Sequence, residues 1–299
     1  VSRCSVNFSN ISWSSGAVSV SFSTPGPSCS FSLITGEPTR PTPCNPDQGG
    51  FTCRVTGLSP GTRYQVMVIS EQDGESGSTT VRTAPLPVQK LMVRHADETT
   101  LSVLWSPPPG EWDGFTVFLR QADPHRMDPA LQQADPHQMD PSLPQVAPAL
   151  PQEAPTLPQV APAPMEVWRA LPREAKEFTF TTLTSGEQYT ITVMTNSGNL
   201  SSSASVRAYT RPAQVSGLLL GVQSSTDSLQ ASWQRASGVL DSYRVLLVSD
   251  SSVIKNESVA ADATSTSFHL LRPGALYRAV LTTVRAGLSS RQTVAEGHT

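Results

Sequence analysis

A chain of 299 residues is long enough for two or three domains, and its 21 Lys and Arg against 24 Asp and Glu give no reason to expect nucleic acid as a partner. Only 15% of the residues are charged, while Ser, Thr, Pro and Gly are abundant, which favours short strands joined by turns over helical bundles. No run of about 18 apolar residues occurs, so we expect no membrane-spanning helix within these residues.

The cysteines all lie in the first 53 residues: Cys4, Cys29, Cys44 and Cys53. An even number in one domain-sized segment indicates two disulfides and an oxidising compartment. Zinc is the alternative, but the cysteine spacings contain no pair separated by two to four residues, as zinc sites usually do. We therefore expect disulfides, and neither a metal nor a cofactor.

Four Asn-x-Ser sequons begin at Asn7, Asn10, Asn199 and Asn256. One sequon is a weak signal, but four of them together with paired cysteines indicate an N-glycosylated chain that is secreted or displayed on the cell surface.

A motif Leu-x-Pro/Ser-Gly-x-x-Tyr, followed by an alternating strand, occurs three times, with its tyrosines at Tyr64, Tyr189 and Tyr277. Upstream of each motif lies an alternating strand that ends in an aromatic residue, and a further strand follows it. These aromatic residues are Phe22, Trp105 and Trp233. Alternation with period two between Pro and Gly turns predicts strands, and we expect the tryptophans and tyrosines to pack in cores.

The spacing of the tyrosines reveals an insertion. Tyr189 and Tyr277 are 88 residues apart, whereas Tyr64 and Tyr189 are 125 apart, so the second repeat holds 37 extra residues. We place them between a strand that ends near Leu119 and one that begins at Glu177. The sequence thus predicts three units of about 1–84, 85–211 and 212–299, with an insert at about 121–163.

The insert contains Gln-Ala-Asp-Pro-His-x-Met-Asp-Pro twice and then a seven-residue Leu-Pro-Gln repeat. Proline every three or four residues blocks helix and removes strand hydrogen-bond donors, so we expect an extended, disordered spacer. Two alternatives stay open, a docking peptide for a proline-recognising partner and a metal site. The metal ligands would be Asp123, His125, Asp128, Asp135, His137 and Asp140.

Units of about 90 residues with some seven strands and a tyrosine at a corner predict all-β, two-sheet sandwiches. All three units resemble fibronectin type III domains. The first unit, with its four cysteines and "FTCRVTGLSPGTRY", resembles the N-terminal extracellular repeat of receptor-type tyrosine phosphatases of the vascular endothelial (beta) type. The later "TDSLQASWQRASGVLDSYRVLLV" is similar to repeats of the same family. The departures are Phe22 in place of Trp, Ser185 in place of Pro, and the insert.

The expected fold suggests how the cysteines pair. The start of the first strand and the end of the antiparallel second strand lie at one edge of the sandwich, so Cys4 can reach Cys29. Cys44 and Cys53 flank a Gly-rich turn and can close a hairpin. Of three possible connectivities we expect Cys4–Cys29 with Cys44–Cys53.

The resemblance implies a complete protein that hydrolyses phosphotyrosine with a cysteine followed six residues later by an arginine. The residues at that distance from the cysteines are Asn10, Thr35, Gly50 and Ser59, so the signature is absent. Motifs of serine hydrolases, zinc proteases and P-loop enzymes are absent too. We therefore expect no catalysis in this chain, and we expect the acidic hairpin tip at 71–77 to be a solvated turn.

The resemblance implies the ectodomain of a single-pass type I receptor on the extracellular side of the plasma membrane. Its partners would be cell-surface proteins such as an endothelial cadherin or an angiopoietin receptor, and its context would be adhesion, signalling and angiogenesis. Two alternatives remain, a matrix or adhesion protein built of the same domains and a cytokine-receptor-like module. Trp112 and Trp168 are the two tryptophans that could instead be exposed and contact a partner.

Overall fold

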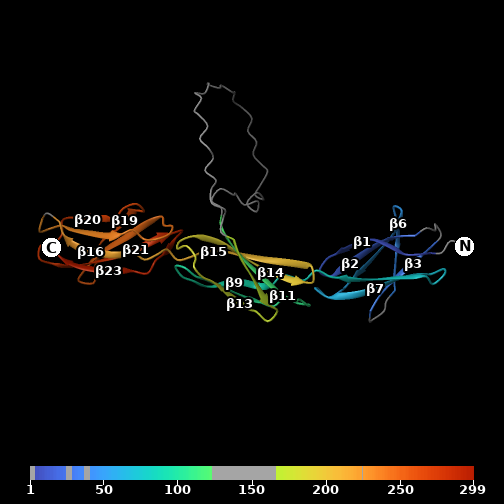
Figure 1. Cartoon of the computed structure of the whole chain (residues 1–299). Helices are drawn as coiled ribbons and strands as arrows, with labels where there is room; N and C mark the ends of the chain where they lie inside the picture. Colours follow the sequence, from blue (N-terminus) through green and yellow to red (C-terminus); the bar gives the residue numbers. More distant parts are fainter. Residues whose placement is uncertain (1–3, 25–28, 37–40, 123–165, 224) are drawn as a thin grey trace, which may run out of the picture.

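The structure is a computed structural model that describes residues 4–24, 29–36, 41–122, 166–223 and 225–299. Its regular elements are strands, arranged as three two-sheet sandwiches that follow one another end to end (Figure 1). The two termini of the chain lie at opposite ends of this row (Figure 1). The described residues form no helix that could cross a membrane.

The first sandwich packs the sheet β1-β2-β6-β5 against the sheet β4-β3-β7-β8. Its strands are β1 (Asn7–Trp13), β2 (Ala17–Ser23), β3 (Phe31–Thr35), β4 (Thr42–Pro43), β5 (Asn45–Asp47), β6 (Gly50–Thr56), β7 (Arg63–Ser70) and β8 (Ser76–Arg82). Phe22 stands where many sandwiches have a tryptophan. Its ring packs edge-on against Phe31 at 4.8 Å and stacks on Phe51 at 5.7 Å, so phenylalanines from three strands fill this part of the core.

The second sandwich packs the sheet β13-β10-β9 against the sheet β12-β11-β14-β15. Its strands are β9 (Gln89–Ala96), β10 (Leu101–Ser106), β11 (Gly114–Gln121), β12 (Glu166–Pro172), β13 (Glu177–Phe180), β14 (Gln188–Ser197) and β15 (Leu200–Tyr209). Tyr189, Ile191 and Val193 alternate inward along β14 and are buried. Trp105 is buried against Phe115, as predicted.

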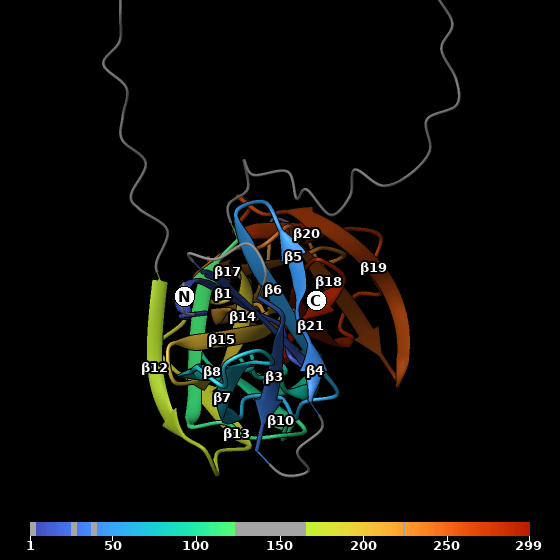
Figure 2. The ribbon, with the colours of Figure 1, turned by 90° about the vertical axis from the view of Figure 1, so that its right-hand side faces the viewer.

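The expected gap between Leu119 and Glu177 contains a strand that we did not predict. β12 pairs with β11 from Gly114–Pro172 to Arg120–Glu166, and it forms the outer edge of its sheet (Figure 2). Its alternation is weak because it partly buries Val167 and Leu171 and leaves its other residues exposed. The insert therefore joins two neighbouring antiparallel strands. Residues 123–165, which contain most of the predicted insert at about 121–163 and every proposed metal ligand, lie outside the described part of the chain.

The third sandwich packs the sheet β16-β17-β20 against a sheet of β19-β18-β21-β22 in which β23 also pairs with β21. Its strands are β16 (Ser216–Val222), β17 (Leu229–Gln234), β18 (Ser242–Ser249), β19 (Ser252–Ala260), β20 (Ser265–Phe268), β21 (Leu276–Arg285), β22 (Leu288–Ser289) and β23 (Thr293–His298). Trp233 packs edge-on against Tyr243 at 5.4 Å, and both are buried. The prediction of all-β sandwiches is confirmed, and Trp105 and Trp233 lie in the cores as predicted.

Candidate functional site: the junctions between the units

Each predicted tyrosine corner closes in the same way. The phenolic oxygens of Tyr64, Tyr189 and Tyr277 each accept a backbone N–H five residues upstream, at 2.9 Å in all three units. The rings occupy the core side of the corner, and Tyr64 is the least buried of the three. The corner is therefore a rigid loop that presents its outer backbone at the end of the sandwich.

A threonine that we did not predict, placed directly after the last strand of each unit, is hydrogen-bonded to each corner. Thr83, Thr210 and Thr299 each donate their hydroxyl to the carbonyl oxygen next to the tyrosine-bonded amide, at 2.6, 2.6 and 2.7 Å. Each hydroxyl also accepts an N–H of the same corner loop, at 3.0 to 3.1 Å. The signal was a threonine just after the last strand of each unit, and it was hidden because its distance from the tyrosine differs between the units.

At the first junction, the corner of the first unit contacts the loop between β10 and β11. The Glu111 N–H donates to the Pro60 carbonyl at 3.0 Å. The Ser197 hydroxyl donates to the Gly61 carbonyl at 2.5 Å and accepts a hydrogen bond from Arg82 at 2.7 Å. Two adjacent carbonyls of the corner thus accept donors from the next unit.

The second junction repeats this arrangement with different side chains. The Val239 N–H donates to the Ser185 carbonyl at 2.9 Å, and the Arg285 guanidinium donates to the Gly186 carbonyl at 3.1 Å. The guanidinium also lies 5.7 Å from the centre of the Tyr209 ring. Arg285 at the second junction belongs to the later unit, whereas Arg82 at the first junction belongs to the earlier one.

Only glycine can occupy the contact position in these corners. Gly61 and Gly186 have φ of +65° and +69°, which favours glycine in any context. A β-carbon would lie 1.8 Å from the Glu111 carbonyl oxygen at the first and 1.9 Å from the Val239 carbonyl oxygen at the second. The glycines therefore allow backbone of one unit to touch backbone of the next.

An aspartate shapes the partner loop at both junctions. Asp113 accepts the Gly198 N–H at 2.6 Å, and Asp241 accepts the Ala286 N–H at 2.8 Å. Each aspartate thereby ties its loop to the turn that follows the long central strand. The Ala286 N–H, and after it the Arg285 guanidinium at 2.7 Å, lower the pKa of Asp241 below its usual 3.8.

The second junction also has contacts on its opposite side. Arg291 of the third unit pairs with Asp97 of the second at 3.1 Å. The Gln214 N–H donates to the Glu98 carboxylate at 3.1 Å. Contacts on two sides of the linker oppose rotation of one sandwich about the other.

The first unit contains the disulfides Cys4–Cys29 and Cys44–Cys53, which is the pairing expected from the strand order. Cys53 is fully buried and lies opposite the end of the short β5 hairpin. The second bridge therefore closes that hairpin from the core side.

The acidic hairpin tip holds the first disulfide in place, which our prediction of a solvated turn did not include. Asp73 accepts the Cys4 N–H at 2.9 Å, and this bond lowers the pKa of Asp73. Glu71 accepts the hydroxyls of Ser32 and Ser30 at 2.7 and 3.0 Å, and these bonds lower its pKa in turn. The tip is exposed, but its carboxylates bind both chain segments that the disulfide joins.

The four sequon asparagines lie on the surface. Asn7 and Asn10 are both exposed on the edge strand β1, where a bulge separates them in register. Asn199 lies in the turn between β14 and β15, and Asn256 lies on the edge strand β19. Each position is open to a glycan, and glycosylation at these four asparagines stays a prediction.

Of the two tryptophans considered for partner contact, Trp168 is 61% exposed on β12. Trp112 is instead partly buried. Its indole N–H donates to the Arg173 carbonyl at 3.0 Å, and the Arg173 guanidinium lies 5.1 Å from the ring centre. Only Trp168 of this pair offers an open aromatic surface.

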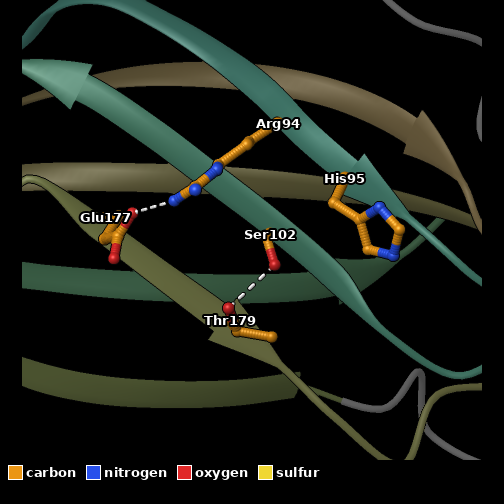
Figure 3. Close-up of a pocket in the computed structure, with 5 residues that line it drawn as sticks. All are labelled: Arg94, His95, Ser102, Glu177 and Thr179. Atoms are coloured by element: carbon orange, nitrogen blue, oxygen red, sulfur yellow. Dashed lines mark hydrogen bonds and ion pairs between the residues drawn. The ribbon is translucent and has the colours of Figure 1, made fainter.

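A shallow groove of about 400 Å³ lies on the outer face of the β9-β10-β13 sheet (Figure 3). Arg94 pairs with Glu177 at 2.5 Å, and the hydroxyls of Ser102 and Thr179 hydrogen-bond at 2.8 Å, with His95 beside them. Four of the five residues that line the groove thus pair with one another. Within the described residues, no cluster of His, Cys, Asp and Glu could hold a metal ion.

Comparisons with known proteins find chains that are similar to this one. Receptor-type tyrosine-protein phosphatase V of Rattus norvegicus is 26% identical over 193 residues, which cover 64% of this chain and 9% of that protein. Tenascin-N of Mus musculus is 24% identical over 269 residues, which cover 88% of this chain and 14% of that protein. A two-domain fibronectin type III segment of chicken tenascin aligns at 19% identity with a TM-score of 0.48, over 71% of this chain and 99% of that one.

This chain spans less than a sixth of the length of either of the two sequence relatives. The family model of the fibronectin type III domain matches residues 86–211 and 213–296, which is more than half of the chain. The chain belongs to the fibronectin type III family.

Proposed function

We propose that this chain is an ectodomain segment of a receptor-type tyrosine phosphatase-like protein and that it acts in extracellular recognition and spacing. The similarity to receptor-type tyrosine-protein phosphatase V supports the protein class. The two disulfides support an oxidising, extracellular location. The segment itself carries out no catalysis in this proposal.

The observation that carries the spacing role is the repeated junction. Domains joined by a short linker move relative to one another unless their interface restrains them. Here two corner carbonyls accept donors from the next unit at both junctions, at Pro60 and Gly61 and again at Ser185 and Gly186. Such an array holds the first unit at a fixed distance from the third.

Recognition would use exposed sheet surface rather than a deep pocket. The groove beside His95 is shallow and its polar groups are already paired. Trp168 supplies an exposed ring on a sheet edge, and aromatic residues are enriched among the energetically important residues of protein interfaces. The partner in this proposal is therefore another extracellular or cell-surface protein.

The finer features of the proposal rest on the sequence resemblance. They are the vascular endothelial (beta) type, an endothelial cadherin or angiopoietin receptor as partner, a role in angiogenesis, and a single-pass type I anchor. The four glycans and the unit boundaries 1–84, 85–211 and 212–299 are also proposals. The similarity to tenascin-N, over 88% of this chain, favours a second candidate, a matrix protein built of the same domains.

Extraction of the native protein separates the two candidates. An antibody raised against this chain would follow the parent protein through sequential extraction of cultured endothelial cells. We expect release with membranes by a non-ionic detergent, together with tyrosine phosphatase activity in the immunoprecipitate. Resistance to detergent, release by urea from cell-free matrix and no phosphatase activity would contradict the receptor and favour the matrix protein.

A further inference from the structure

The outer face of the large sheet of the third unit carries an apolar row. Leu246 of β18 lies opposite Val280 of β21, and Val280 lies opposite Val294 of β23. The neighbours along these strands, such as Val245 and Ala279, are buried, so the row points away from the core. Val294 is 49% exposed, and Leu246 and Val280 are partly exposed. Solvent therefore reaches aliphatic side chains on three adjacent strands.

The apolar surface continues into the next row along the same strands. Val248 of β18 lies opposite Val253 of β19, which is 58% exposed. Arg278, which lies opposite Val248 on the other side, is paired with Glu296 at 2.7 Å. Contiguous apolar side chains on an outer face often mark a contact surface. We call the five aliphatic side chains of these two rows the outer patch: Leu246, Val248, Val253, Val280 and Val294.

A sequon lies at the end of the apolar row. Asn256 of β19 is exposed and lies directly opposite Leu246. The Arg244 guanidinium donates to the Asn256 Oδ1 at 3.2 Å. Because a guanidinium is only a donor, the amide nitrogen Nδ2 lies on the opposite side of the amide from Arg244 and its polar row with Ser258 and Thr282. Nδ2 is the atom that carries an N-linked glycan, so the first sugar would begin beside the outer patch.

The size and composition of the outer patch favour a sugar over a protein partner. A stable protein interface takes roughly 20–30 residues from each side, whereas the outer patch offers five apolar side chains. It contains no aromatic ring, although Trp, Tyr and Arg dominate the binding energy of protein interfaces. Two strand spacings separate Asn256 from Val280, roughly 10 Å in all, which is within reach of the first two sugars of a glycan.

We propose that the outer patch is the packing surface of an N-linked glycan at Asn256, whose first two N-acetylglucosamine residues lie over Leu246 and Val280. The C–H groups on one face of each sugar ring cover the aliphatic side chains, and the sugar hydroxyls remain in water. The proposal rests on the glycosylation in the proposed function and gives one of its glycans a structural role. It also makes this face unavailable to a protein partner.

Ser258→Ala tests the proposal, because it removes the sequon and keeps both Asn256 and the hydrogen bond from Arg244. The native chain and the variant are secreted from mammalian cells, and peptide mass spectrometry reports the occupancy of Asn256. We expect loss of the glycan to lower the calorimetric transition of the third unit by about 4 °C, because the outer patch then returns to water. Native and variant chains made without glycans in a bacterial periplasm should share the lower transition.

Joint replacement of Leu246 and Val280 by threonine provides the matched background, because it removes the apolar row and leaves the sequon. In that background, chains with and without Ser258→Ala should differ by less than about 1 °C. Nuclear Overhauser contacts between the sugars and labelled leucine and valine methyl groups give the direct readout in the native chain. We expect them at Leu246 and Val280, and not at Val222, which is 59% exposed on another sheet.

An unmodified Asn256 in the secreted chain would overturn the proposal and leave the spacing function intact. An occupied Asn256 without sugar contacts at Leu246 and Val280, and with no effect of Ser258→Ala on the transition, would overturn the packing alone. Analytical ultracentrifugation of the glycosylated chain tests a second copy as the occupant. A dimer that the threonine replacements abolish would show that another copy covers the outer patch, and would contradict the glycan.

Discussion

Gly186→Ala tests whether backbone contact holds the second and third units together. The added β-carbon would lie 1.9 Å from the Val239 carbonyl oxygen, and a backbone atom has no alternative rotamer that could relieve the clash. Gly274→Ala is the matched control, because its φ of +71° is nearly the same as +69° at Gly186 but its β-carbon has no neighbour within 4 Å. The two variants differ in the junction alone.

The expected difference follows from the bonds that the clash would break. Both variants force alanine into a left-handed conformation, which costs about 1–2 kcal/mol in either unit. Gly186→Ala must also separate the units, with loss of the hydrogen bonds from the Val239 N–H and the Arg285 guanidinium. At about 1 kcal/mol net for each bond, docking weakens by about 2 kcal/mol, or roughly 30-fold in the ratio of docked to undocked molecules.

The assay is pulsed electron paramagnetic resonance, with spin labels on non-canonical amino acids at the exposed positions Ser203 in the second unit and Ser258 in the third. We expect narrow distance distributions in the native chain and in Gly274→Ala, and a broad one in Gly186→Ala. A narrow distribution in Gly186→Ala, at the native distance, would refute the reasoning, because the two backbones could not then be in contact.

Further predictions concern the corners, the disulfide and pH. Thr210→Val leaves corner groups unsatisfied, so we expect the second unit to lose about 1–3 kcal/mol in chemical denaturation, against less than about 1 kcal/mol for the surface variant Thr192→Val. Joint replacement of Cys4 and Cys29 by alanine should cost the first unit about 3 kcal/mol and leave the calorimetric transition of the third unmoved. The lowered pKa of Asp241 means that its stabilisation is full above about pH 3.8 and is lost as pH falls through the folded-state value. The distance distribution between the second and third units should therefore broaden only in acid.

The sandwiches could be predicted from the sequence because their signals are local. Alternating strands and the corner motif lie within short segments, and the tyrosines that the motif contains close the corners by hydrogen bonds. β12 was missed because an edge strand buries few residues and so shows little alternation. The hydrogen bond from the Cys4 N–H to Asp73 was missed because the two residues are 69 positions apart, and sequence spacing gives no sign of that contact.

The junctions could not be predicted because they depend on how whole units meet. Gly61 was visible as part of the corner motif, but its contact with Glu111 appears only when two sandwiches are placed end to end. The repeated Gly-x-x-Asp at Gly110 and Gly238 was a usable signal. We did not use this signal, because a glycine in the loop before a strand usually indicates only a turn unless a neighbouring unit lies against it.

Amide hydrogen exchange at Glu111 and Val239 tests the head-to-tail junctions most directly. Both amides lie in loops, yet each donates a hydrogen bond to a carbonyl of the preceding unit, at 3.0 and 2.9 Å. We expect both amides in the native chain to exchange at least a hundredfold more slowly than exposed loop amides, and Gly186→Ala to remove that protection at Val239 alone. Exchange of both at the rate of exposed loops, while the strand amides stay protected, would contradict the docked array.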